Sequence, residues 1–270
     1  SLFIGAKAYR EDDPPHYEST YVSGWDVRSL AFMERAIGAA RPGIRFGVEE
    51  VFLRSADELA RMRDPGVEIA REAWNEIMTD GQTSAIVTIG TQRACHATEV
   101  CLATMLGVAP FKRGADPRLS SSPVQFVWSC DEYDRLPSSF AVIGQQREIS
   151  PSERPRKTIA LKVLNKTFEV RAEGDLMYDF GLIAAQRRRT GIWLVIAGLS
   201  GPATHAAALL LEEITADVPR ADPGRTPPVL LAVIEAQLKR DVNRRGDNRE
   251  VKTQKVALVD KWEAPDFARR

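Results

Sequence analysis

Two short polar stretches contain the residue types that bind anions or move protons. The first follows an apolar, β-branched run at residues 85–89 and reads Gly-Thr-Gln-Arg-Ala-Cys-His from Gly90 onward. An apolar helix pattern comes next, so a hydroxyl, a guanidinium and free backbone N–H groups gather at a helix amino end. These are the groups that hold a phosphate or a carboxylate. The predicted binding residues here are Gly90, Thr91, Gln92, Arg93 and His96.

This first loop resembles the phosphate loop of flavodoxin-like flavin reductases, in which a strand ends in Gly-Ser-x-Arg. The match covers Gly90, Thr91 and Arg93. The loop lies in the middle of the chain and lacks the Asn or Ser that usually follows, so no flavin or other cofactor is predicted. An ordinary strand-to-helix turn, with Arg93 paired to an acid, is the alternative.

The second stretch, at residues 196–207, reads IAGLSGPATHAA and again joins an apolar strand to a helix. Glycines let a ligand approach the backbone closely, and a serine can cap a helix or bind a phosphate. The glycines are spaced GxxG, and no GK[ST] follows, so neither a dinucleotide fingerprint nor a P-loop is present. The predicted binding residues here are Gly198, Ser200 and Gly201.

Together the two loops indicate one site. Turns of this kind lie at the carboxyl ends of strands, where ligands of open α/β sheets bind. Each helix also carries a histidine near its start, His96 and His205. The helix dipole disfavours the charged form of such a histidine, which suits a neutral hydrogen-bonding group or a base.

Three residues near these loops could support catalysis: Cys95, Glu99 and His205. A thiol at a helix amino end is favoured as the thiolate, and His205 from the second loop is a better geometric partner for it than the adjacent His96. The competing interpretation is that Cys95 and Cys101 face the core, because cysteine is among the most buried residue types.

Two charged regions have simpler explanations. Acids at residues 131–134 follow a predicted strand and could hold Mg²⁺ or a ribose hydroxyl, but a solvated acidic turn is the favoured interpretation, and no metal site is predicted. Basic residues at 187–189 and 239–255 are interleaved with acids in the second region and lack stacking aromatics. We therefore do not expect nucleic-acid binding.

Hydrophobic periodicity predicts the elements that position these loops. Helices are expected at residues 25–37, 66–78 and 202–214, and strands at 2–8, 46–53, 85–89, 124–129, 139–144, 158–164, 178–186 and 192–197. Residues 229–238 and 251–262 read as a long hairpin with an exposed basic tip. Residues 229–238 fit a helix about as well, and that alternative stays open.

Composition bounds the class of protein. The chain has 270 residues, 44% of them hydrophobic, and 37 basic residues balance 37 acidic ones. Its three cysteines have no CxxC spacing, and no apolar run reaches ~18 residues, so we expect neither a disulfide framework nor a membrane span. A cytoplasmic protein is expected. Because the chain begins at Ser1 without Met, it also fits a fragment of a longer protein.

The sequence as a whole predicts one α/β domain over residues 1–270. The expected fold is a Rossmann-like three-layer sandwich with a mixed sheet, whose centre is parallel and whose antiparallel additions come from the C-terminal third. The first functional hypothesis is a sensor or regulatory domain that binds a small anionic ligand, most simply a nucleotide or nucleotide derivative. The alternatives are a hydrolase or transferase using Glu99, His205 or Cys95 on such a ligand, and a structural module that forms homo-oligomers.

Overall fold

The structure is a computed structural model. The residues that it describes are 2–4, 6–7, 21–22, 27–33, 68, 71–72, 74–75, 78, 85–91, 95–112, 122–128, 138–143, 159–188, 191–220, 225–239 and 249–264. The predicted strand at 46–53, the acids at 131–134 and the basic tip at 240–248 lie outside these residues.

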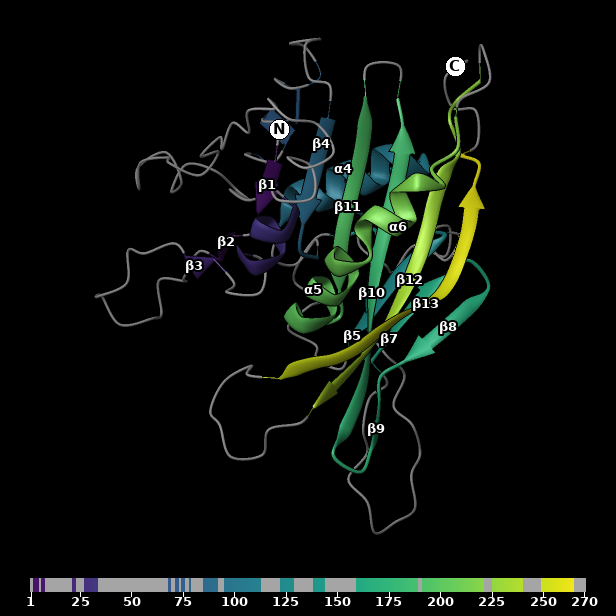
Figure 1. Cartoon of the computed structure of the whole chain (residues 1–270). Helices are drawn as coiled ribbons and strands as arrows, with labels where there is room; N and C mark the ends of the chain where they lie inside the picture. The colour runs from purple at the N-terminus through teal and green to yellow at the C-terminus, as the bar shows by residue number, and fades with distance from the viewer. Residues whose placement is uncertain are drawn as a thin grey trace, which may run out of the picture.

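A seven-stranded sheet dominates the described part of the chain (Figure 1). Six strands lie in the order β1 (Leu2–Ile4), β4 (Ala85–Ile89), β11 (Ile192–Gly198), β10 (Leu176–Arg187), β12 (Val229–Lys239) and β13 (Glu250–Trp262). The seventh strand, β9 (Arg171–Glu173), pairs with one end of β10. Two short strands, β2 (Ala6–Lys7) and β3 (Tyr21–Val22), pair with each other separately.

The sheet has a parallel side and an antiparallel side. Strands β1, β4 and β11 run parallel, whereas β11, β10, β12 and β13 alternate in direction. Short connections explain the antiparallel pairing of β9 with β10 and of β10 with β11, because a few residues reverse a chain but cannot return it to a parallel position. The turn at 174–175 joins β9 to β10, and residues 188–191 join β10 to β11.

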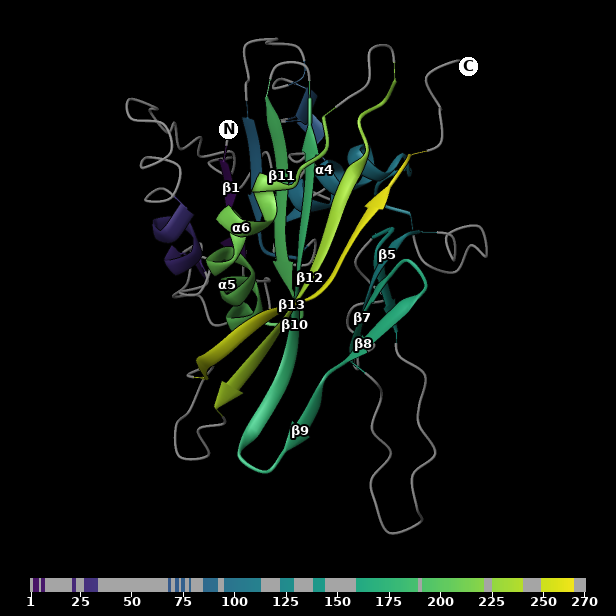
Figure 2. The ribbon, with the colours of Figure 1, turned by 45° about the vertical axis from the view of Figure 1, so that its right-hand side comes forward.

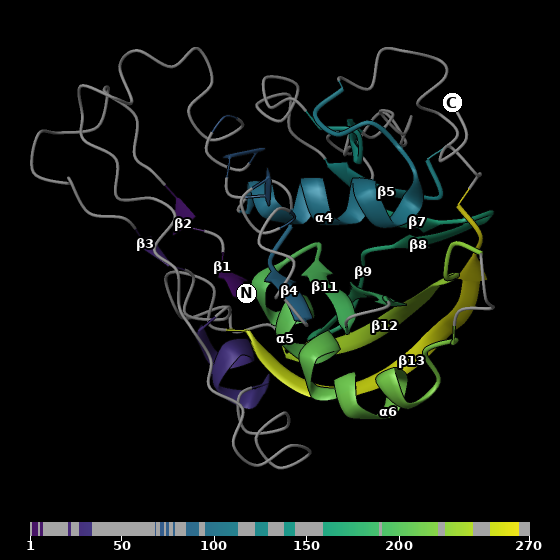
Figure 3. The ribbon, with the colours of Figure 1, turned by 90° about the horizontal axis from the view of Figure 1, so that it is seen from above.

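Both faces of this sheet are covered (Figure 3). Helix α4 (His96–Leu106) packs on one face with a second sheet. Helices α5 (Gly201–Leu209) and α6 (Leu211–Ala216) cover the other face with the helical segment 27–33. The strands supply both cores by alternation, because successive side chains point to opposite faces.

The second sheet has four strands and lies beside β12 and β13 (Figure 2). Its order is β6 (Ala141–Ile143), β5 (Val124–Trp128), β7 (Ala160–Val163) and β8 (Lys166–Glu169). Buried Phe126, Leu161 and Val163 pack against Leu182 and Leu231 of the large sheet.

The predicted Rossmann-like three-layer sandwich is wrong. Strands predominate over helices in the described residues, and the parallel strands occupy one side of the sheet rather than its centre. A β-sheet also replaces helices over much of one face. The cause lies in residues 159–264: β9 and β10, β10 and β11, and β12 and β13 pair antiparallel, and β10 lies between β11 and β12, the two strands that α5 and α6 connect.

Several predicted elements are confirmed. The hairpin of β12 and β13 is present, which settles residues 229–238 as strand. The predicted helix at 202–214 is interrupted at Leu210, where α5 ends and α6 begins. Among the described residues, no helix is both long and apolar enough to cross a membrane.

Candidate functional site: a crevice between two strand-to-helix turns

The two predicted loops are neighbours. Ile89 of β4 and Ile196 of β11 are paired in parallel register, and the Gly90 N–H donates to the Ile196 carbonyl oxygen at 2.9 Å. The turn from β4 into α4 and the turn from β11 into α5 therefore leave the same edge of the sheet from adjacent strands.

The helices that follow these turns separate. Helix α4 packs on the face formed by Ile86, Trp193 and Val195, whereas α5 packs on the opposite face (Figure 3). Two adjacent parallel strands whose helices diverge to opposite faces leave a crevice outside their carboxyl ends, where ligands of open α/β sheets bind. The two turns thus lie where this rule places a ligand site, and we refer to the region between them as the crevice.

The β11–α5 turn is held by groups of the protein itself. The Ser200 hydroxyl caps α5 by accepting from the Ala203 N–H at 3.4 Å, and it donates to Asp179 Oδ2 at 2.5 Å. Asp179 is 2% exposed, accepts from the Phe180 N–H at 2.7 Å, and lies 3.7 Å from the Arg249 guanidinium. A buried carboxylate therefore already occupies the positive end of α5.

Close packing explains the glycines beside this turn. A Cβ on Gly198 would lie 2.3 Å from the Thr204 nitrogen, and one on Gly181 would lie 2.5 Å from the Ala203 carbonyl oxygen. The two glycines face each other across β10 and β11. They let α5 lie directly on the sheet.

The β4–α4 turn is built differently. Gly90 has a φ of 98°, a conformation that favours glycine, and its carbonyl oxygen accepts from the Thr98 hydroxyl at 2.9 Å. Thr91 is buried, and its carbonyl oxygen accepts from the Cys95 N–H at 2.8 Å. Cys95 is the N-cap residue of α4, yet it makes no side-chain cap hydrogen bond in the described structure. Gln92 and Arg93 lie outside the described residues.

Glu99 is fully buried behind the first turn of α4. Its Oε1 accepts from the Phe111 and Ser139 N–H groups at 3.0 and 2.7 Å, and its Oε2 accepts from the Ser138 hydroxyl at 2.8 Å. Burial raises the pKa of Glu99, and these hydrogen bonds oppose that shift. The carboxyl group thereby ties α4 to the segment after it and to the start of β6.

Sequence reasoning missed a small cluster beside α4. The Phe111 ring centroid lies 6.2 Å from that of His96, and the Arg71 guanidinium lies 5.3 Å from the Phe111 ring. Phe111 has a φ of 59°, which is costly for a bulky residue, and its N–H is one of those that Glu99 binds. Only the long-range fold unites these residues, so sequence periodicity gave no signal for the cluster.

The three predicted catalytic residues have separate surroundings. Cys95 is 1% exposed in the core on the α4 face, and Glu99 is enclosed by its donors. His205 lies on α5, on the opposite face of the sheet, where its Nδ1 is 3.4 Å from the Ser29 hydroxyl. Burial and the nearby Arg28 lower the pKa of His205.

Comparison of the chain with protein-family models, with curated proteins and with solved structures finds no match.

Proposed function

We propose that the crevice between the β4–α4 and β11–α5 turns binds a small anionic ligand, most simply a nucleotide or nucleotide derivative, and that the protein is a sensor or regulatory domain. The observation that carries this proposal is the pairing of β4 with β11 in parallel while their helices cover opposite faces. In open α/β sheets this is the position of ligand sites.

The two sides of the crevice suit different parts of such a ligand. We place the anionic group at the amino end of α4, because Asp179 accepts from the Ser200 cap of α5, whereas the carboxyl group in the first turn of α4, Glu99, is engaged by donors of other segments. The Arg93 guanidinium, expected from the sequence, and Arg71 supply positive charge on that side. The Phe111 ring offers a surface for the base.

A sensor is favoured over an enzyme by the disposition of the titratable groups. Glu99 has both oxygens engaged by donors, and His205 lies on the opposite face of the sheet from Cys95. A general base must come within hydrogen-bond reach of the proton that it removes. The groups at this crevice are those that bind a ligand.

Thermal unfolding with ATP, GTP, NAD, cyclic AMP and the matching nucleosides tests the proposal. A ligand present at ~100 times its Kd should stabilise the native protein by about 2.7 kcal/mol. Arg93→Ala and Arg71→Met should each weaken the response to nucleotides. Arg225→Met serves as the matched control. Arg225 is exposed and precedes β12, whose first residue, Val229, pairs with Gln186 at the end of the strands that lies away from the two turns. The absence of any shift with all of these compounds would exclude the proposed function.

A further inference from the structure

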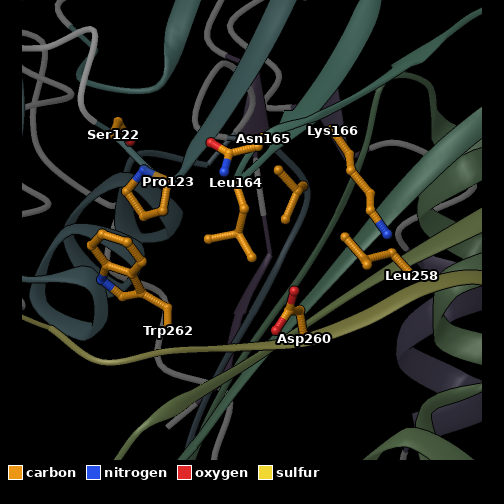
Figure 4. Close-up of a pocket in the computed structure, with 9 residues that line it drawn as sticks. Ser122, Pro123, Leu164, Asn165, Lys166, Leu258, Asp260 and Trp262 are labelled. Carbon is orange, nitrogen blue, oxygen red and sulfur yellow. The ribbon is translucent and has the colours of Figure 1, made fainter.

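A cavity lies between the large and the small sheet, next to the end of β13 and away from the two strand-to-helix turns (Figure 4). Its volume is about 420 Å³, within the range of small-molecule sites. The large sheet contributes one wall from the end of β13, and the small sheet contributes the other from the β7–β8 turn and the start of β5. The lining residues are Ser122, Pro123, Val163, Leu164, Asn165, Lys166, Leu258, Asp260 and Trp262.

The β13 wall contains a charge where an apolar residue is expected. Leu258, Asp260 and Trp262 alternate along the strand and share one face, and their partners Val233, Leu231 and Val229 all belong to the apolar core on that face. Asp260 interrupts this pattern with an exposed carboxylate. An exposed carboxylate beside an apolar cavity is open to contact with a ligand.

The opposite wall supplies a positive charge. Lys166 and Asp260 both line the cavity, and in Figure 4 the Lys166 side chain extends along one side of it while Asp260 lies on the β13 wall. Among the described residues, neither group forms an ion pair, since the Asp260 carboxylate accepts only from the Lys261 N–H at 2.8 Å. Two opposite charges therefore face one cavity without neutralising each other.

The rest of the cavity is apolar and held in place. Pro123, Val163 and Leu258 are buried, and the half-buried Trp262 ring is fixed by its Nε1–H bond to the Leu106 carbonyl oxygen at 3.1 Å. Leu164 adopts a φ of 54° in the β7–β8 turn, and its N–H donates to the Pro123 carbonyl oxygen at 2.6 Å. A leucine in this conformation is strained, and preformed walls reduce the entropy lost on binding.

We propose that this cavity binds a small zwitterion with an apolar body, which is the chemistry of a hydrophobic amino acid. Its ammonium group pairs with Asp260, its carboxylate with Lys166, and its side chain packs against Trp262 and Leu164. The bound molecule contacts both sheets at once, so it stabilises their packing. This site is independent of the proposed nucleotide crevice.

Calorimetric titration with L-phenylalanine, together with analogues that each lack one charge, tests this site. N-acetyl-L-phenylalanine has no ammonium group, and L-phenylalaninamide has no carboxylate. We expect Asp260→Asn to weaken L-phenylalanine binding by about tenfold and to leave the affinity for the N-acetyl analogue unchanged. Lys166→Met should weaken L-phenylalanine binding similarly and leave the affinity for the amide unchanged.

Matched controls are Lys162→Met, an exposed lysine on β7 outside the cavity, and Asp175→Asn, an exposed acid in the β9–β10 turn. Neither should alter L-phenylalanine binding, and unfolding without ligand verifies that each variant is folded. L-leucine, titrated in parallel, should bind in the same way. The proposal is overturned if neither amino acid binds at about 10 mM. It is also overturned if Asp260→Asn and Lys166→Met bind L-phenylalanine as the unsubstituted protein does.

Discussion

The two strand-to-helix turns of the crevice look alike in sequence and differ in construction. The β11–α5 turn is closed by its own groups, with Ser200 as the cap, Asp179 as a buried counter-charge and Gly198 as the point of helix contact. The β4–α4 turn is longer, and its helix begins at Cys95 without a side-chain cap in the described structure.

This difference shows that glycine, serine and a helix amino end do not by themselves make an anion site. A helix dipole attracts negative charge whether the charge comes from a ligand or from the protein. Asp179 supplies that charge to α5. In the proposed site, the β4–α4 turn is therefore the side that contacts the anionic group, and the β11–α5 turn is the opposite side.

The largest expected effect concerns the close packing of α5. Gly198→Ala should lower the free energy of unfolding by about 3 kcal/mol, near the upper end for overpacked positions, because the new Cβ would lie 2.3 Å from the Thr204 nitrogen. Urea unfolding measures the loss. Gly174→Ala is the control, since its φ is +59° and nothing lies within 4 Å, so only backbone strain of about 1 kcal/mol is expected. Equal losses in the two variants would mean that the contact of α5 with the sheet is not tight.

The next effect concerns the buried charge at α5. Asp179→Asn should cost about 2 kcal/mol, because Asp179 accepts from Ser200 and lies 3.7 Å from Arg249. Ser200→Ala should cost about 1 kcal/mol through the lost cap. The double variant should lose less than the sum of the two, since both substitutions remove the same hydrogen bond.

These variants also test the comparison of the turns. If the β11–α5 turn does not bind the anionic group of the ligand, Ser200→Ala should leave the nucleotide affinity within about twofold of that of the unsubstituted protein. Calorimetry on the folded variant measures this. A large loss of affinity would place the anionic group at α5 instead.

The sequence was sufficient for the local elements near the crevice. Alternation and β-branched residues predicted the strands at 85–89 and 192–197, and the glycine and proline positions marked where the helices begin. That the two turns leave neighbouring strands was an expectation of open α/β sheets, and the register of Ile89 with Ile196 supports it.

The sequence was insufficient for strand pairing and for side-chain contacts between residues that lie far apart in the chain. The predicted parallel centre failed because β10 lies antiparallel between β11 and β12, and which strands become neighbours depends on long-range pairing. Asp179 acts as a counter-charge because β10 pairs beside β11 and so brings it to Ser200. Phe111 contacts His96 because the segment after α4 folds back toward the start of that helix. Local periodicity carries no information on such contacts.

A smaller effect is expected on the α4 side, where Glu99 makes stability depend on pH. Burial raises the pKa of Glu99 above its ordinary value of 4.5, so the folded protein binds this proton more tightly than the unfolded chain does. The stability that the group contributes is then fully present below pH 4.5 and is lost as the pH rises through the folded pKa.

Glu99→Gln should remove this dependence and cost about 1 kcal/mol at acidic pH, because the amide replaces an acceptor oxygen at the Ser138 hydroxyl. The difference in unfolding free energy between the two proteins should shrink as the pH rises. Glu212→Gln, at an exposed position of α6, should show no such trend. A difference that grows with pH would contradict a raised pKa.

The smallest effect is expected at His205 on the other side of the sheet. Burial and then Arg28 lower the pKa of His205, so the folded protein binds this proton less tightly than the unfolded chain. Its contribution to stability is present above pH 6.5 and is lost as the pH falls through the folded pKa. Because the imidazole is half-buried, the effect should be about 0.3 kcal/mol.

Urea unfolding between pH 5 and 7.5 at low and high salt separates the two causes at His205. The Arg28 contribution should fall with added salt, whereas the contribution from burial should persist. Arg28→Gln should reproduce the high-salt result, and His205→Gln should remove the dependence entirely. If the dependence disappears at high salt without any substitution, then Arg28 rather than burial governs His205. The packing of α5 against the segment 27–33 would then be more open to solvent than the β11–α5 turn that precedes it.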